Sequence, residues 1–190
     1  MKTKQQVLYL VMVIGAVAGF IASFWQLLDK LQLLKNSHVA LSCNLNSVFN
    51  CTNILNSHQS SVFGFPNALM CVIMFTIALV AGLIGMGGAG IAKGLRFFFQ
   101  FLAFFTVVFG LWYLWESIFN VGALCIFCVF CFSGVLLINF AWLRINYKDY
   151  PLSKKCSLWL SKSIAHGADI FLWILIGLVV VAEALIKFVK

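Results

Sequence analysis

Charged residues are scarce in this chain. Asp, Glu, Lys and Arg make up 9% of its 190 residues, and five of these are acidic, whereas soluble globular domains carry roughly 25% charged residues. Hydrophobic residues make up 63% of the chain, and the mean hydropathy is +1.04. This composition excludes an ordinary soluble domain, so we predict an all-α integral membrane protein.

Features that would indicate a nucleic-acid or phosphate ligand are also missing. The 13 basic residues give a net charge of +8, but they form no patch interleaved with aromatic side chains. They lie in short segments between apolar runs, as is typical of contacts with lipid headgroups. The glycine-rich segment 85–90 is no phosphate loop, because no Gly-Lys-Ser follows it. We expect membrane lipid as a partner and no nucleic acid.

Several apolar runs are long enough to cross a bilayer, which takes about 20 residues. Spanning helices are predicted at 7–28, 66–84, 95–118, 124–143 and 168–188. The first run is too long for the core of a signal peptide. Its Gly15 and Gly19 form a G-x-x-x-G motif, which favours close helix contact. The sequence therefore predicts one bundle domain of five spanning helices.

Basic residues between these runs are divided unequally between the two sides of the membrane. One side carries Lys2, Lys4, Lys93, Arg96, Arg144, Lys148, Lys154, Lys155 and Lys162, and the other carries Lys30, Lys35, Lys187 and Lys190. Because positive charge is retained in the cytoplasm, the first group should be cytoplasmic. The polar segment 29–65 and the short turn 119–123 then share the outer face.

Two cysteine pairs stand at this outer face. Cys43 and Cys51 lie in the polar segment, and Cys125 and Cys128 open the fourth apolar run. Positions i and i+3 share a helix face, and the positive end of a helix favours thiolate, so the second pair is typical of a redox-active dithiol. Two dithiols on one oxidising face can pass electrons by thiol–disulfide exchange. One pair can meet a soluble partner, and the other can meet a lipid-soluble acceptor such as a quinone.

The other three of the seven cysteines are interpreted differently. Cys71 and Cys131 are expected to pack in the core, with Cys131 pointing away from Cys125 and Cys128. Cys156 falls on the cytoplasmic, reducing side.

A metal site is a competing interpretation of the outer pair. His38 and His58 flank Cys43 and Cys51, and together they could bind zinc. Solvated loop histidines are the favoured reading, and we expect no metal.

The motifs together resemble a known family. They are Cys43-x7-Cys51, Ser57, Phe63-Gly64-Phe65-Pro66 before the second helix, and Cys125-Ile126-Phe127-Cys128 before the fourth. In this order they resemble the vitamin K epoxide reductase family with its bacterial homologues, over roughly residues 7–143. The resemblance implies a four-helix transmembrane bundle around a quinone, with a fifth transmembrane helix as in many bacterial members.

The resemblance also implies a division of the chain. Residues 1–145 would form the four-helix catalytic core, with its extracytoplasmic cysteine loop at 29–65. A basic cytoplasmic loop would follow at 146–166, and the fifth transmembrane helix at 167–190.

The resemblance implies roles for the matching residues. Cys43 would exchange with a thioredoxin-like partner, Cys51 would pass electrons to Cys125, and Cys128 would reduce the quinone. Ser57 would help to hold the loop over the quinone.

Contacts with the quinone are expected from Cys128, Leu55, Ser60, Phe63 and Phe132. Family members that reduce vitamin K epoxide have Asn where Ser60 stands and Tyr where Phe132 stands. Oxidation of a thiol carrier with ubiquinone or menaquinone is therefore favoured over epoxide reduction.

We thus predict an enzyme of the bacterial inner (cytoplasmic) membrane, multi-pass, with its active site facing the periplasm. It would be a quinone-dependent thiol–disulfide oxidoreductase that reoxidises a periplasmic thioredoxin-like (DsbA-like) disulfide donor. Many bacterial homologues carry a fused thioredoxin-like domain after the fifth helix, and this chain stops at Lys190, so a separate donor protein is expected.

Three alternatives remain open. They are a vitamin K quinone or epoxide reductase, a non-enzymatic membrane protein that handles metal, and an assembly subunit with a structural Cys43–Cys51 disulfide. The unrelated disulfide-bond protein B type is disfavoured, because its two cysteine pairs occur in the reverse order.

Overall fold

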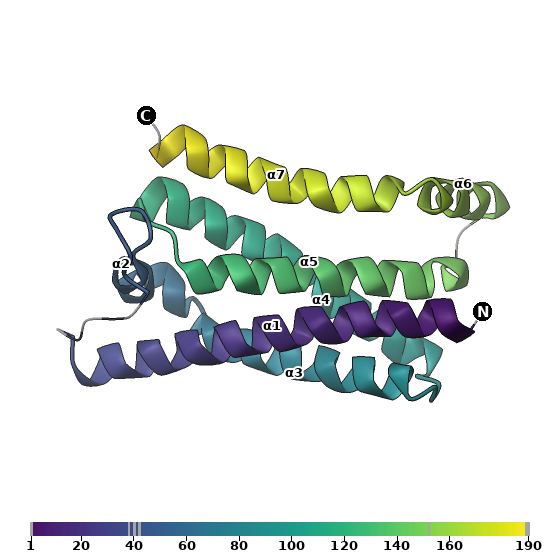
Figure 1. Ribbon diagram of the computed structural model, residues 1–190, viewed down its shortest axis with the longest axis horizontal. Coiled ribbons are helices and arrows are strands. Elements are labelled where there is room, and N and C mark those ends of the chain that lie inside the picture. The colour runs from purple at the N-terminus through teal and green to yellow at the C-terminus, as the bar shows by residue number, and fades with distance from the viewer. Residues whose placement is uncertain (1, 38, 40, 42, 152, 189–190) are drawn as a thin grey trace.

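Long helices form a bundle in the computed structural model, which describes residues 2–37, 39, 41, 43–151 and 153–188 (Figure 1). Within these ranges, five helices are long and apolar enough to cross a membrane. They are α1 (Lys2–Lys35), α3 (Asn67–Met86), α4 (Lys93–Glu116), α5 (Ile126–Asn146) and α7 (Ala168–Phe188). The predicted all-α membrane fold is confirmed.

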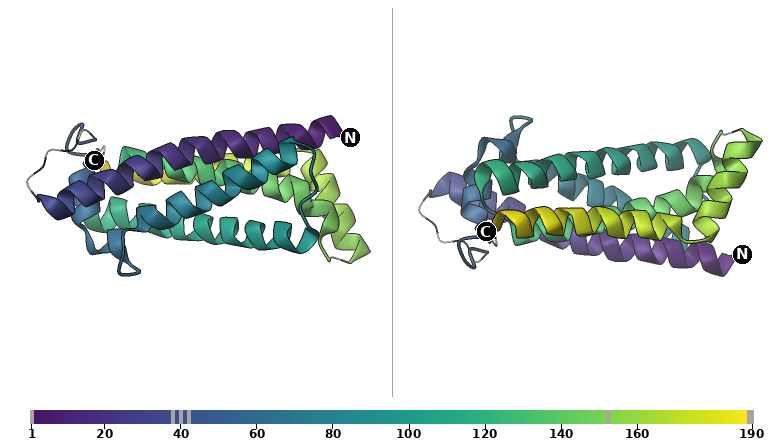
Figure 2. Two further views of the ribbon diagram at one scale, coloured as in Figure 1. Left: turned by 90° about the horizontal axis from the view of Figure 1, so that it is seen from below. Right: turned by 90° about the horizontal axis from the view of Figure 1, so that it is seen from above.

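Shorter elements lie at the two ends of the bundle. They are α2 (Cys51–Asn56), η1 (His58–Ser61), η2 (Ser117–Val121), η3 (Tyr147–Asp149) and α6 (Lys154–Ala165). Figure 2 shows α2 at one end and α6 running across the other, beside the N-terminus. The element η2 is a π-helical continuation of α4.

Helix α1 is central, because it packs along both α3 and α5. Glycines allow the close approach. A Cβ on Gly134 would lie 2.6 Å from the carbonyl oxygen of Gly15, and a Cβ on Gly19 would lie 2.1 Å from the ring of Phe75. The close helix contact predicted at Gly15 and Gly19 is confirmed, and it brings α1 against the helix that begins after Cys125.

Helix α1 extends beyond its predicted end at Leu28 and stops at Lys35. Asp29 and Lys30 read as the start of a polar loop, but both side chains are buried in the helix. The apolar pattern resumes after them, and Leu33 is buried. The first seven residues of the expected loop 29–65 are therefore helical, and two charged side chains face the interior.

The predicted basic loop 146–166 also contains helical structure. It includes η3 and α6. Helix α6 begins after Ser153, whose hydroxyl accepts a hydrogen bond from the backbone N–H of Cys156. Leu158 and Trp159 are exposed, and Ile164 is buried.

The two ends of the bundle differ in charge. The turn between α3 and α4, the end of α5 and helix α6 lie at the end that holds the N-terminus (Figure 1). Lys93 and Arg96 in the first turn of α4, Arg144 near the end of α5, Lys148 in η3 and the lysines of α6 lie at this end. Helix α2 and the start of α5 lie at the opposite end, so both cysteine pairs lie together, away from the main basic cluster.

Ion pairs fasten the basic end. Arg144 on α5 contacts Asp169 on α7 through two bonds, Nε to Oδ2 at 2.6 Å and Nη2 to Oδ1 at 2.9 Å. The side chain of Asp169 is 3% exposed. Asp149 contacts Lys93 at 3.2 Å and Arg96 at 2.6 Å. The first pair attaches α7 to the other helices from within the structure.

Candidate active site

Backbone hydrogen bonds join the cysteine loop to the start of α5. The N–H of Leu124 donates to the carbonyl oxygen of Val48 at 2.7 Å, and the N–H of Asn50 donates to that of Leu124 at 3.0 Å. These bonds accompany an isolated parallel bridge between Phe49 and Leu124. Helix α5 therefore begins at Ile126, two residues later than predicted, and the loop is held beside its first turn.

Helix α2 begins next to this bridge. The side chain of Asn50 accepts a hydrogen bond from the backbone N–H of Asn53 at 3.1 Å, which caps the helix. The first residue of α2 is Cys51. The cap and the bridge together place the Cys51 sulfur against the segment that precedes α5.

The four cysteines form a continuous chain of sulfur atoms. Cys43 and Cys51 form a disulfide, and the Cys51 sulfur lies 3.4 Å from the Cys125 sulfur. Cys125 and Cys128 are free thiols. The exposed fractions of all four residues are 7% or less. The two pairs meet on one face of the bundle, as the orientation argument from the sequence required.

Cys125 occupies the N-cap position of α5. A hydrogen bond from the Cys128 thiol, with further N–H groups of Cys128 and Phe127, lowers the pKa of the Cys125 thiol, although burial opposes the shift. The helix start thus favours thiolate at Cys125, as the spacing of the pair indicated. A thiolate at this position is directed at the Cys51 side of the outer disulfide.

The lowered pKa predicts how Cys125 titrates. Because the shift favours thiolate, Cys125 should deprotonate at a lower pH than an ordinary thiol. Replacing Cys128 with alanine removes the hydrogen-bond donor, so the midpoint should rise. The measurement is the ultraviolet thiolate absorbance against pH, as the difference between each protein and its counterpart that also carries Cys125→Ser. An unchanged midpoint in Cys128→Ala would contradict the assignment.

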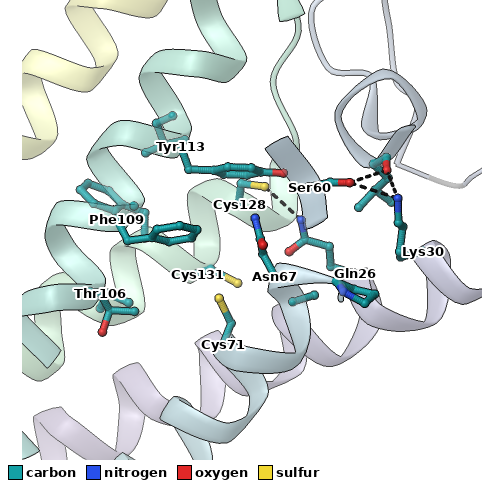
Figure 3. Close-up of a pocket in the computed structure, with 17 residues that line it drawn as sticks. Gln26, Lys30, Ser60, Asn67, Cys71, Thr106, Phe109, Tyr113, Cys128 and Cys131 are labelled. Atoms are coloured by element: carbon teal, nitrogen blue, oxygen red, sulfur yellow. Dashed lines mark hydrogen bonds between the residues drawn. The ribbon is translucent and has the colours of Figure 1, made fainter. Parts of the chain in front are cut away.

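A cavity lies beside Cys128, between α1, α3, α4 and α5 (Figure 3). It contains about 640 Å³ of space not filled by atoms, part of it open to the surroundings. Its apolar walls include Leu55, Pro66, Phe109, Leu114, Phe132 and Val135. This apolar lining is suited to an aromatic headgroup.

Polar side chains are concentrated at the end of the cavity near the cysteine loop. Gln26 donates from Nε2 to the Cys128 sulfur at 3.2 Å. The Lys30 ammonium group donates to the carbonyl oxygen of Leu55 and to the Ser60 hydroxyl. Ser60 also donates to the carbonyl oxygen of Leu55, at 2.7 Å. Helix α1 thereby holds the loop and orients the Cys128 thiol.

Asn67 closes the same end from α3. Its Nδ2 donates to the carbonyl oxygen of Gln59 at 2.6 Å, and its Oδ1 accepts from the N–H of Val62 at 3.2 Å. These bonds fasten η1 to the first turn of α3.

The amino-acid sequence matches one protein-family model. The model described as the vitamin K epoxide reductase family matches residues 10–145. The chain belongs to this family. The match contains both cysteine pairs and the residues that line the cavity. No individually curated protein matches the chain.

Family membership implies membrane redox chemistry of thiols and disulfides, and this family is known to use quinone. The lining fits a quinone ring, because it has apolar walls, a free thiol at Cys128 and polar side chains at one end. If a quinone is bound, Cys128, Leu55, Ser60 and Phe132 would contact it, all of which line the cavity.

Two predicted positions lie elsewhere. Phe63 is not a lining residue; it is 45% exposed, and its ring packs on Phe109, which does line the cavity. The loop turns outward at Phe63, where Gly64 has a φ of 81°. Ser57 ends α2, and its hydroxyl donates to the carbonyl oxygen of Ile54 at 2.7 Å. It supports the loop and does not line the cavity.

Cys131 belongs to the buried hydrophobic core and Cys71 packs against it, as predicted. Both also line the cavity together with Cys128, so the prediction that Cys131 points away from Cys125 and Cys128 is wrong. Cys131 is three positions after Cys128, so it shares that residue's helix face. The prediction for Cys131 relied on its spacing from Cys125, whereas its spacing from Cys128 decides which residues it lies beside.

Other lining residues were not predicted. They are Gln26, Lys30, Asn67 and Tyr113, which all line the cavity. Polar residues within apolar membrane-spanning runs often belong to a functional site, and this was the sequence signal that could have identified them.

The alternative zinc site would have used His38 and His58. His58 is exposed, and His38 lies outside the described residues. Within the described ranges, no group of three or more His, Cys, Asp or Glu side chains is arranged to hold a metal ion.

Proposed function

We propose that the protein is a quinone-dependent thiol–disulfide oxidoreductase that reoxidises a thioredoxin-like disulfide donor. The observation that carries this proposal is the 3.4 Å separation between the Cys51 and Cys125 sulfurs. It connects an outer disulfide to a dithiol whose second member, Cys128, borders the cavity.

The first exchange takes electrons from the donor. A thiolate of the reduced donor attacks Cys43, the Cys43–Cys51 bond breaks, and Cys51 leaves as thiolate. The donor's second thiol then displaces Cys43, so the donor departs as a disulfide and the outer pair is a dithiol. Because Cys43 is 3% exposed, the loop around it must be displaced for the donor to reach the sulfur.

The second exchange moves the same two electrons inward. The Cys51 thiolate attacks Cys125 of a Cys125–Cys128 disulfide, and Cys128 leaves as thiolate. Cys43 then attacks Cys51, which restores the outer disulfide and releases Cys125. The product has an outer disulfide and an inner dithiol, the combination that the structure contains.

Asp29 is placed to assist this step. Its Oδ2 lies 3.5 Å from the Cys43 sulfur, and both residues are buried. The carboxylate can accept the thiol proton as Cys43 attacks Cys51.

A bound quinone would supply the oxidant, taking up two electrons and two protons as the Cys125–Cys128 disulfide forms. The side chains of this protein hold the reacting thiol in place: Gln26 donates to the Cys128 sulfur, and Lys30 fixes the loop through Leu55 and Ser60. Ubiquinone and menaquinone are the proposed acceptors.

The proposed location is the bacterial inner membrane, with the cysteine end facing the periplasm. The unequal distribution of basic residues supports this orientation, because most of them lie at the opposite end of the bundle. The periplasm would also supply the thioredoxin-like donor as a separate protein.

The test combines purified protein, a reduced thioredoxin-like donor and a short-chain ubiquinone. We expect quinone reduction, followed by absorbance, with one donor disulfide formed for each quinone reduced. In a separate incubation with the oxidised donor, the Cys43 thiol of Cys51→Ala should attack the donor disulfide and accumulate a mixed disulfide, because no Cys51 thiol is present to displace the donor from Cys43. Its matched control, Cys43→Ala, should not accumulate it.

Failure to reduce quinone would overturn the enzymatic proposal. A mixed disulfide that forms equally in Cys43→Ala would overturn the assignment of Cys43 as the residue that meets the donor.

A further inference from the structure

The polar side chains that line the cavity differ in whether their own hydrogen bonds are made. Four of them donate hydrogen bonds to other atoms of the protein; they are Gln26, Lys30, Ser60 and Asn67. Thr106 likewise donates a hydrogen bond to the carbonyl oxygen of Leu102 at 2.7 Å. The Tyr113 hydroxyl has no hydrogen-bond partner among the described residues. Tyr113 lines the cavity, so its hydroxyl remains free to donate to a molecule held there.

Tyr113 is held firmly in this position. It belongs to α4 and is 9% exposed. Its ring stacks on that of Phe109, with centroids 6.3 Å apart and an interplanar angle of 11°. In Figure 3 its hydroxyl points into the region between Cys128 and Ser60. The packing of the ring fixes where the hydroxyl lies before any ligand arrives.

Phe132 lines the same cavity from α5, and its ring carries no hydrogen-bond donor. Phe132 faces the cavity from α5, and its ring is so close to α4 that a Cβ on Gly110 would lie 2.8 Å from it. Phe132 and Tyr113 thus line the same cavity, and of these two rings only that of Tyr113 carries a hydroxyl.

We propose that Tyr113 determines specificity by donating a hydrogen bond to a carbonyl oxygen of the quinone ring. This inference rests on the proposed function. A lipid hydrocarbon offers no acceptor at this depth, whereas a quinone carbonyl satisfies the free hydroxyl. The same bond stabilises negative charge as it develops on that oxygen during electron transfer from the inner dithiol.

The test uses Tyr113→Phe, which removes the hydroxyl and keeps the stacked ring. Binding is measured on the fully oxidised protein, in which no turnover occurs, by quenching of tryptophan fluorescence. The probes are dimethylnaphthoquinone and dimethylnaphthalene, which has the same rings without carbonyl oxygens. We expect Tyr113→Phe to bind the quinone about 3- to 10-fold more weakly and to bind the hydrocarbon as the unmodified protein does.

Two controls separate this role from a structural one. Tyr147→Phe removes a hydroxyl at the opposite end of α5 and should leave both dissociation constants unchanged. Reduction of the Cys43–Cys51 disulfide by a reduced donor, in a single turnover, should proceed at the same rate in Tyr113→Phe as in the unmodified protein, while the KM for quinone rises.

The outcomes distinguish the two proposals. If the unmodified protein binds no quinone, the proposed function fails and this inference with it. If the unmodified protein binds quinone and Tyr113→Phe binds it equally well, only the role of Tyr113 is overturned. Equal weakening for quinone and hydrocarbon, or a slowed outer exchange, would also overturn it, because it would show a packing defect.

Discussion

Replacing Cys128 with serine is expected to abolish quinone reduction and to trap a disulfide between Cys51 and Cys125. The two sulfurs are 3.4 Å apart, so the Cys125 thiolate can attack Cys51 and release Cys43. Without the Cys128 thiol, the Cys51–Cys125 bond cannot be resolved toward an inner disulfide. Cys43 can still reverse the step by attacking Cys51, so the Cys51–Cys125 disulfide should accumulate alongside the Cys43–Cys51 disulfide. We expect the rate of quinone reduction to fall by at least about 10³-fold.

The trapped bond is measured by mass spectrometry of peptides prepared without reductant, and the rate by quinone absorbance. Cys156→Ser is the matched control, because Cys156 is an exposed thiol on α6 at the other end of the bundle. It should reduce quinone normally and form no new disulfide. Activity close to normal in Cys128→Ser would show that the electrons leave by another route.

The second large effect is expected at the ion pair between α5 and α7. Arg144→Met would leave the Asp169 carboxylate, which is 3% exposed, buried without its cation. Breaking a buried pair in this way lowers the free energy of unfolding by about 3–5 kcal/mol. The measurement is thermal or denaturant unfolding of the purified protein in detergent. Proteolysis between η3 and α7 should also become faster as α7 detaches.

Two further variants test the cause. Lys93→Met alters a pair whose side chains are 57% and 36% exposed, and Arg96 still contacts Asp149; the cost should be about 1 kcal/mol or less. Combining Arg144→Met with Asp169→Leu removes both buried charges and should recover most of the lost stability. Equal losses in Arg144→Met and Lys93→Met would contradict the assignment.

The helices and the meeting of the cysteine pairs could be predicted because both depend on local composition. An apolar run must form a helix in lipid, since no water satisfies its backbone groups. The basic residues then decide which ends share a side. From these two rules Cys51 and Cys125 were expected on one face, and the structure places their sulfurs in contact.

The lining of the cavity could not be predicted in the same way. A helix that is apolar on every side gives no sign of which side faces its neighbours. Its spacing from Cys125 predicts that Cys131 points away from the site, but Cys131 lies on the same helix face as Cys128 and lines the cavity with it. Asp29 and Lys30 ended the predicted helix because they are charged, yet α1 buries both beside the cysteine loop.

The amino-acid sequence alone determined that this is a multi-pass helical membrane protein with two cysteine pairs on one face, because hydropathy and charge act on each segment separately. The tertiary structure decided which side chains surround Cys128, and that a hydroxyl from α4 stands free there. Those features depend on how far each helix is rotated about its axis, and contacts such as that between Gly134 and Gly15 set this rotation across distant parts of the chain.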